Sequence, residues 1–337
     1  MSDDRDAGDT PGASSHRRRQ NMAASVRSRL TTLAHAQGEE PEYVLTRYAL
    51  ERLLYRLSQS PHTGAFILKG AFLFALWEGH PHRATRDLDL LGFGPNDVNC
   101  IEQVFRDICT VPVEGDGLTF LPETVHARPI REQQEYGGIR VLLQATLGTA
   151  RLRVQADVGF GDVVTPAAQE ADLPTLLDLP GLPAPHLRVY PRETVVAEKF
   201  EAMVRLGLTN TRMKDFYDLL ILARTFAFDG QTLAAAIGAT FARRRTDLPS
   251  PHQPPLALSG EFAGDAAKQA EWQSFLKRTK LESVSLALRT VIEELSIFLL
   301  PLIAVLARGT DFSHRWQPGG PWQPPSGRRD SARIAAE

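Results

Sequence analysis

Two aspartates, Asp87 and Asp89, are separated by a single residue in an apolar stretch of the chain. Side chains alternate between the two faces of a β-strand, so both carboxylates project to one side while Leu88 and Leu90 project into a core. Neighbouring carboxylates repel each other unless a cation lies between them, and Mg²⁺ binds such oxygens together with substrate phosphates. The pair is consistent with a magnesium site, although an isolated Asp-x-Asp is more often a solvated strand end.

The segment before the aspartates favours a ligand site. Residues 65–68 are apolar and predict a short buried strand that ends at Lys69 and Gly70. Glycine lacks a Cβ, which suits a sharp turn or a close approach of the backbone to a ligand. Residues 71–77 are apolar on almost every side and predict a deeply packed helix, whose first backbone N–H groups suit a phosphate. The order of strand, glycine, helix and carboxylates therefore predicts a site for a metal and a phosphate.

A third carboxylate lies in a predicted hairpin. Residues 138–146 and 150–158 have the composition and alternation of two strands, joined at 147–149. Asp157 shares the polar face of the second strand with Arg151 and Arg153. The pattern therefore places this carboxylate on a polar face beside arginines, near the end of a strand.

Two predicted helices in the second half carry further polar residues. Lys199, in helix 192–206, lies at the edge of an apolar stripe. Either its stem follows the core while its ammonium reaches water, or the ammonium contacts a phosphate. In helix 212–226, Arg212, Asp215 and Asp218 recur at three-residue spacing and share a face. An Arg–Asp pair at a surface contributes little stability, so this pattern alone assigns no function.

Composition limits the kind of protein and its compartment. The chain has 337 residues and a formal net charge of −2, enough for one large domain or two smaller ones and without a general basic field for nucleic acid. The only cysteines, Cys100 and Cys109, match no metal or redox motif, which predicts a reducing cytoplasm. The N-terminus lacks a signal-peptide core, and the apolar run 295–307 is short and contains Pro301. We therefore expect no membrane segment.

Periodicity predicts the remaining elements. One helix begins near Met22 and a second follows Pro41, with Tyr48, Arg52 and Arg56 outside its apolar stripe. Residues 111–127 predict irregular strand and loop. Further helices are expected over 100–109, 233–244, 266–280 and 283–306. The polar segments 1–20 and 309–337 predict disordered tails. The Arg243–Arg245 triplet predicts either a contact with RNA phosphates or a solvated helix end.

Several of these motifs together resemble a known family. In chain order they are Lys69-Gly70-Ala71, Arg83-x-Thr85-x-Asp87-x-Asp89, Asp157, Ala197-Glu198-Lys199 and Lys214-Asp215-x-x-Asp218. Their order and residue types, over roughly 66–222, resemble the AbiEii-type nucleotidyltransferase toxins. That family is a branch of the DNA polymerase β-like superfamily that includes the MenT toxins.

The resemblance implies an α+β fold and a role for each residue. Residues 21–187 would form a polymerase β-like core, a small mixed sheet flanked by helices, and 188–308 a helical C-terminal lobe. Asp87 and Asp89 would hold Mg²⁺, and Asp157 would complete the acidic cluster and accept the acceptor's proton. Gly70 and Ala71 would approach the triphosphate, with Thr85 beside them, and Lys69 would face a phosphate or pair with an acid. Lys199 would contact the nucleotide, and Asp215 or Asp218 would orient Lys199 or the acceptor.

The implied activity is transfer of a nucleoside monophosphate from an NTP to an RNA acceptor, with the tRNA 3′ end as the favoured target. The protein would then be the toxin of a toxin–antitoxin pair and have an antitoxin protein as partner. Two alternatives remain at this stage: a catalytically idle nucleotide- or RNA-binding protein, and an NTP-dependent phosphotransferase. The chain departs from the family at Ala71, where a second Gly or a Ser is common, and this departure would alter the choice of nucleotide.

Overall fold

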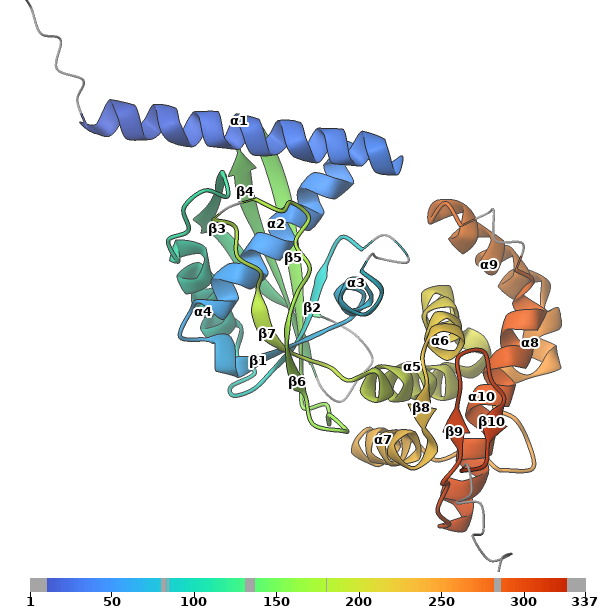
Figure 1. Cartoon of the computed structure of the whole chain (residues 1–337). Coiled ribbons are helices and arrows are strands. Elements are labelled where there is room, and N and C mark those ends of the chain that lie inside the picture. The colour runs from blue at the N-terminus through green and yellow to red at the C-terminus, as the bar shows by residue number, and fades with distance from the viewer. Residues whose placement is uncertain are drawn as a thin grey trace, which may run out of the picture. The chain divides into compact units, whose positions relative to one another are not determined.

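The chain folds into two compact units in the computed structural model, which describes residues 11–79, 83, 85–130, 137–179, 181–281 and 286–325 (Figure 1). The first unit comprises residues 1–161 and 169–189, and the second comprises 162–168 and 190–337. The sequence predicts this boundary between 187 and 188. The short segment 162–168, which precedes that boundary, nevertheless belongs to the second unit.

A seven-stranded mixed sheet forms the centre of the first unit, in the order β3-β4-β5-β2-β1-β7-β6. The strands are β1 (Phe66–Lys69), β2 (Leu88–Gly92), β3 (Leu118–Ile130), β4 (Gly138–Leu147), β5 (Ala150–Phe160), β6 (Gln169–Asp172) and β7 (His186–Val189). The pairs β2–β5 and β1–β7 are parallel, and the other neighbours are antiparallel. The helices are α1 (Pro11–Gln37), α2 (Pro41–Ser58), α3 (Phe72–Glu78) and α4 (Val98–Thr110), with a 3-10 turn at Thr63–Ala65. The expected α+β fold, a mixed sheet flanked by helices, is confirmed.

The hairpin β4–β5 gives the sheet one covered face and one open face. Alternate residues such as Val141, Leu143 and Val154 are buried, and α2 and α4 contact these strands and β3. The residues between them include Gln144 and Arg153, which are exposed. Because strand side chains alternate strictly, the helices cover the apolar face and leave the polar face open.

Three expectations for the first unit are wrong. Residues 118–130 form one long edge strand rather than irregular structure; a register shift between Leu121 and His126 disrupts the alternation that identifies a strand. Helix α1 begins at Pro11 rather than near Met22, while residues 1–10 lie outside the described part. Only Leu73 and Phe74 of α3 are fully buried, so that helix is less deeply packed than its composition predicts.

The polar residues of α2 are buried, which its sequence pattern did not predict. Arg52 and Arg56 are 0% and 3% exposed, so both need an anionic partner. Asp116 supplies it: one carboxylate oxygen lies 2.6 Å from Nη1 of Arg56, and Tyr48 donates a hydrogen bond to the Asp116 carbonyl. The α2 face outside the apolar stripe therefore packs on a buried polar cluster and does not face solvent.

The second unit is mainly helical. It contains α5 (Arg192–Leu206), α6 (Met213–Thr225), α7 (Gly230–Arg243), α8 (Gly260–Gly264), α9 (Ala266–Arg278) and α10 (Leu288–Arg308), with 3-10 turns at Gly207–Thr209 and Leu256–Leu258. A small sheet joins β8 (Phe228–Asp229), β9 (Arg315–Trp316) and β10 (Trp322–Gln323) in the order β10-β9-β8. The predicted disorder beyond residue 309 is therefore wrong for 309–325. Trp316 explains the order, because it is buried against Phe298 and donates a hydrogen bond to the Ala223 carbonyl.

Helix α10 is the one helix of the described residues whose length and composition would allow it to cross a membrane. The expectation of no membrane segment rested on the short apolar run 295–307. Helix α10 is longer than that run, with 21 residues. Leu295, Phe298 and Leu302 lie on a buried face, and α10 contacts α6 and α7. That packing gives the apolar residues of α10 a structural role in the core of the second unit.

Candidate active site

Strands β2 and β5 bring the three predicted acids together. Asp87 immediately precedes β2, and Asp89 lies in β2 directly opposite Asp157 of the parallel strand β5. One carboxylate oxygen of each residue lies within 4.8 Å of those of the other two. All three side chains are half-buried. Asp87, Asp89 and Asp157 are called the acidic trio below.

The acidic trio has the donor set of a hard divalent cation. Mg²⁺ binds oxygen at about 2.1 Å, so two ligands of one ion lie at most about 4.2 Å apart. Carboxylates within 4.8 Å need only a small contraction to reach that geometry. In the described part of the chain, this is the only group of three or more His, Cys, Asp or Glu side chains with this spacing. The trio therefore fits a hard divalent cation.

Arg140 contacts the trio and was missed by the sequence analysis. Its Nε and Nη2 donate hydrogen bonds to the two carboxylate oxygens of Asp157, at 2.8 and 2.6 Å. Arg140 lies opposite Asp157 because the tight turn at Gly148 and Thr149 pairs Leu147 with Ala150 and so fixes the whole register. The hairpin predicted from the sequence, with its turn over 147–149, would instead pair Thr146 with Ala150 and place Arg140 opposite Ala156. Arg140 orients Asp157 and offsets part of the trio's negative charge.

Gly70 packs directly against Asp89. Its φ is +79°, a left-handed conformation that favours glycine, and a Cβ at this position would lie 2.0 Å from Oδ2 of Asp89. Any side chain at residue 70 would therefore displace the carboxylate. Lys69 lies opposite Asp89 in the β1–β2 pair, and its ammonium lies next to Gly159 of β5. Lys69 thus extends along the strands that carry the trio.

Ala71 and Thr85 flank the turn and the acids. Ala71 is buried immediately before α3, which has only seven residues and therefore supplies a weak helix dipole. The Thr85 hydroxyl donates to Oδ1 of Asp87 at 3.1 Å, and the Thr85 N–H donates to the Tyr43 hydroxyl at 3.3 Å. Thr85 thereby orients Asp87, and Tyr43 of α2 supports Thr85.

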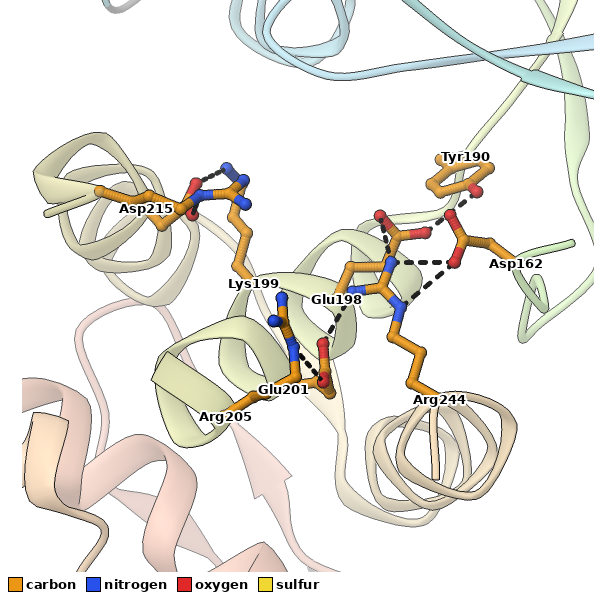
Figure 2. Close-up of polar contacts among 9 residues, drawn as sticks. Asp162, Tyr190, Glu198, Lys199, Glu201, Arg205, Asp215 and Arg244 are labelled. Carbon is orange, nitrogen blue, oxygen red and sulfur yellow. Dashed lines mark hydrogen bonds and ion pairs between the residues drawn. The ribbon is translucent and has the colours of Figure 1, made fainter. Parts of the chain in front are cut away.

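Lys199, Asp215 and Asp218 meet in the second unit, where α5 lies next to α6. The Lys199 ammonium donates to Oδ1 of Asp215 and to Oδ2 of Asp218, both at 2.7 Å (Figure 2 shows Lys199 and Asp215). Nε of Arg212 lies 2.7 Å from the other oxygen of Asp215. Burial opposes ionisation of Asp215, but Lys199 and Arg212 outweigh it and lower its pKa. Both candidate aspartates therefore bind Lys199.

The family model for the nucleotidyl transferase AbiEii toxin of type IV toxin–antitoxin systems matches residues 52–294. This chain belongs to the AbiEii nucleotidyltransferase toxin family. The match covers well over half of the chain and extends beyond the motif region 66–222 in both directions. It confirms the resemblance, and it implies a nucleotide substrate and an antitoxin partner.

Two solved structures have a distantly similar fold to this AbiEii family member. One is a protein from H. pylori assigned as a nucleotidyltransferase, with a TM-score of 0.47, 14% identity, and 81% of this chain and 100% of that chain covered. The other is JHP933 from Helicobacter pylori, with a TM-score of 0.42, 15% identity, and coverage of 77% and 92%. Neither likeness is close enough to transfer residue roles. No curated protein sequence matches the chain.

The opposite side of α5 carries a second ionic cluster. Arg244, just after α7, donates to Glu201 at 2.8 Å and to Asp162 at 2.9 Å, and lies 3.4 Å from Glu198 (Figure 2). Tyr190 donates a hydrogen bond to Glu198. Arg244 is therefore neither a solvated helix end nor an exposed phosphate contact. It secures α5, the helix that carries Lys199, within the second unit of this AbiEii family member.

A cavity of about 420 Å³ lies beside Ala71 and Thr85 in the first unit. Residues of α1, α2, α3 and the segment 173–176 line it. Its wall includes Glu51, which is 4% exposed and accepts a hydrogen bond from the Leu176 N–H at 2.7 Å. Burial raises the pKa of Glu51 to about 7. The cavity has the volume of a small-molecule site, and its wall holds a carboxyl group that titrates near neutral pH.

Proposed function

We propose that this AbiEii family member is a Mg²⁺-dependent enzyme of the cytoplasm that moves a nucleoside monophosphate from an NTP to an RNA acceptor. The favoured acceptor is the 3′ end of tRNA, and the protein acts as the toxin that a cognate antitoxin opposes. The acidic trio beside Gly70 carries the proposal, because three carboxylates with a close backbone approach suit a metal–triphosphate ligand. Family membership supports the nucleotidyltransferase class.

Asp87 and Asp89 would hold the Mg²⁺, with Asp157 completing the set. When bound, Mg²⁺ would supply positive charge that stabilises the negative charge developing during phosphoryl transfer. Thr85 fixes the Asp87 carboxylate through its hydroxyl, and Gly70 leaves Asp89 the space it needs. The chain thus positions its acidic ligands before any substrate arrives.

The acceptor hydroxyl oxygen forms a bond to the α-phosphorus, the bond to the bridging oxygen breaks, and pyrophosphate leaves. Asp157 is the candidate base for the hydroxyl proton. Arg140 donates to both Asp157 oxygens and Gln155 donates to Oδ1 at 3.4 Å, so Oδ2 is the oxygen that retains a lone pair for that proton. Arg140 therefore orients the Asp157 carboxylate and still leaves it able to accept a proton.

Positive and neutral groups of the chain hold the nucleotide in this proposal. Backbone N–H groups at Gly70 and Ala71 contact the phosphates, and Lys69 supplies a point charge to them. Lys199 of the second unit, bound by Asp215 and Asp218, is proposed as a further nucleotide-binding residue. Phosphoryl transfer depends mainly on positioning and charge, which these groups would supply together with the metal.

One observation favours a second candidate, a catalytically idle nucleotide- or RNA-binding protein. The bidentate Arg140–Asp157 pair neutralises one member of the trio without any metal. An idle binder gains thermal stability from NTP but turns nothing over. It also retains that gain in an Asp89→Asn variant.

Purified full-length protein with bulk tRNA and each of the four NTPs, labelled in turn at the α- and the γ-phosphate, tests the proposal. We expect the α-label to enter RNA with release of pyrophosphate, and EDTA to abolish the transfer. Transfer of the γ-label would instead identify a phosphotransferase. Thermal stabilisation by NTP without transfer of either label would identify an idle binder.

A further inference from the structure

The open face of β3–β5 carries a row of charged residues that ends at the acidic trio. Arg128 of β3 lies opposite Arg140 of β4, Arg140 lies opposite Asp157 of β5, and Asp157 lies opposite Asp89 of β2. Directly paired residues on adjacent strands project from the same face of a sheet. The arginines and the trio therefore share one surface, the face that α2 and α4 leave open.

A second pair of arginines extends this surface along β5. Arg151 and Arg153 lie opposite Thr146 and Gln144, and both arginines are exposed. They have the same strand parity as Asp157, so they project from the same face. From Arg151 to Asp157 the strand rises about 20 Å, at about 3.4 Å per residue. That length accommodates several nucleotides of a single strand.

Ion pairs within the described part of the fold do not account for Arg128, Arg151 and Arg153. Arg128, Arg151 and Arg153 form no ion pair with any acid of the described residues, whereas Arg140 is bound to Asp157. Within β4 and β5 the only acid is Asp157, although the chain as a whole has a net charge of −2. No aromatic residue of these two strands lies on the open face; Phe160 is buried. The surface therefore suits phosphates rather than stacked bases.

We propose that this basic face, defined by Arg128, Arg151 and Arg153, binds the phosphodiester backbone of the RNA acceptor and leads its 3′ end to the acidic trio. The proposal rests on the function proposed above for the trio. Continuity along β5 favours RNA over an acidic protein, because this strand carries Arg151 and Arg153 as well as Asp157, the candidate base. Phosphate contacts of this kind do not distinguish sequences, so the face supplies affinity and direction rather than selectivity.

The test compares the double variant Arg151→Gln/Arg153→Gln with Lys277→Gln/Arg278→Gln, which removes the same charge from an exposed site at the end of α9. Fluorescein-labelled bulk tRNA is bound without NTP across a salt series, and fluorescence anisotropy gives the affinity. Loss of two phosphate contacts reduces the slope of log affinity against log salt by about 1.4, at about 0.7 per contact for a single strand. The control variant keeps the wild-type slope.

Steady-state transfer separates this inference from the proposed function. We expect KM for tRNA to rise about tenfold in the double variant, with kcat and KM for NTP unchanged, since two phosphate contacts are lost. Wild-type affinity and slope in the double variant, or equal losses in the control variant, would overturn the inference even if nucleotide transfer is normal. Arginine-dependent RNA binding without any transfer would instead support the face and refute the proposed function. Normal transfer combined with resistance to the antitoxin would assign the face to a protein partner and overturn the RNA assignment.

Discussion

Substituting Gly70 with alanine tests whether the position of the Asp89 carboxylate matters for catalysis. Gly70→Ala places a Cβ 2.0 Å from Oδ2 of Asp89 at a φ of +79°. Gly79 is the matched control, because its φ is +78° and nothing lies within 4 Å of an added Cβ. Both substitutions should cost about 1–2 kcal/mol of unfolding free energy from the left-handed backbone. Only Gly70→Ala should also reduce kcat, by about 100-fold, because it displaces a carboxylate.

Circular dichroism first establishes that both glycine variants are folded. If their kcat values are then equal, the position of the Asp89 carboxylate does not matter for catalysis. The pair thus distinguishes backbone strain from displacement of the acid.

The buried Glu51 carboxyl group should make the unfolding free energy of the protein depend on pH. Burial raises its pKa to about 7, above the ordinary value of 4.5, so the folded protein holds this proton more tightly than the unfolded chain. Stability from this group is therefore full below pH 4.5 and is lost as the pH rises towards 7. Glu51→Gln should raise the unfolding free energy at pH 8 by about 1–3 kcal/mol and leave it unchanged near pH 4.5.

Urea denaturation at the two pH values measures this difference for Glu51→Gln. Exposed Glu293→Gln is the control and should show no pH-dependent difference. A destabilised Glu51→Gln variant at pH 8 would show that the buried carboxylate, held by the Leu176 N–H and near Arg52, stabilises the fold.

At the scale of elements, the packing of α5 against α6 depends on the charge of Lys199. Lys199→Met leaves Asp215 and Asp218 buried, at 1% and 0% exposure, without the ammonium that binds both. Breaking a buried ion pair on one side costs about 3–5 kcal/mol. The triple variant Lys199→Met/Asp215→Asn/Asp218→Asn should recover much of this loss, and exposed Lys214→Met should lose almost nothing. Guanidinium denaturation measures all three variants, and a stable Lys199→Met protein would refute the coupling.

The same cluster should make the protein less stable at low pH. The lowered pKa of Asp215 means that its contribution is present at neutral pH and is lost as the pH falls through its folded value, below its ordinary 3.8. Under the proposed function, loss of activity in a Lys199 variant would have two causes: the loss of the proposed nucleotide contact and the loosening of the α5–α6 packing. Both are separated by measuring activity at a temperature where the variant is fully folded.

Sequence patterns predicted elements with strong local signals. The strand before Gly70, the 138–158 hairpin and helix 192–206 depend on alternation, turn chemistry and helical spacing, and all three occur. Patterns failed where distant segments decide the structure. The order beyond residue 309 depends on Trp316 packing on Phe298, and the burial of Arg56 depends on Asp116, which no local pattern encodes.

The candidate site divides in the same way. The convergence of Asp87 and Asp89 follows from one strand, whereas the place of Asp157 beside them depends on the parallel pairing of β2 with β5. The resemblance to the family implied that Asp157 belongs to the cluster, but not the strand pairing that brings it there. Arg140 depends on the exact hairpin register, which the turn predicted over 147–149 misses by one residue. Tyr43 reaches Thr85 from a separate helix, which no local pattern encodes.

At the scale of the whole molecule, the chain is an AbiEii family member whose two units each contribute a cluster of candidate groups. The first holds the acidic trio, Gly70 and the basic face, and the second holds Lys199 with its two aspartates. The central claim is that the trio is a metal site for nucleotidyl transfer.

The most direct test measures kcat/KM for transfer of α-labelled NTP to bulk tRNA in wild type, Asp89→Asn and exposed Asp247→Asn, each with Mg²⁺ and with EDTA. Metal-assisted charge stabilisation is worth several kcal/mol, so we predict a loss of at least about 10³-fold in Asp89→Asn and in EDTA. Asp247→Asn should match wild type. Transfer by Asp89→Asn at the wild-type rate, or transfer that EDTA leaves intact, would contradict the claim.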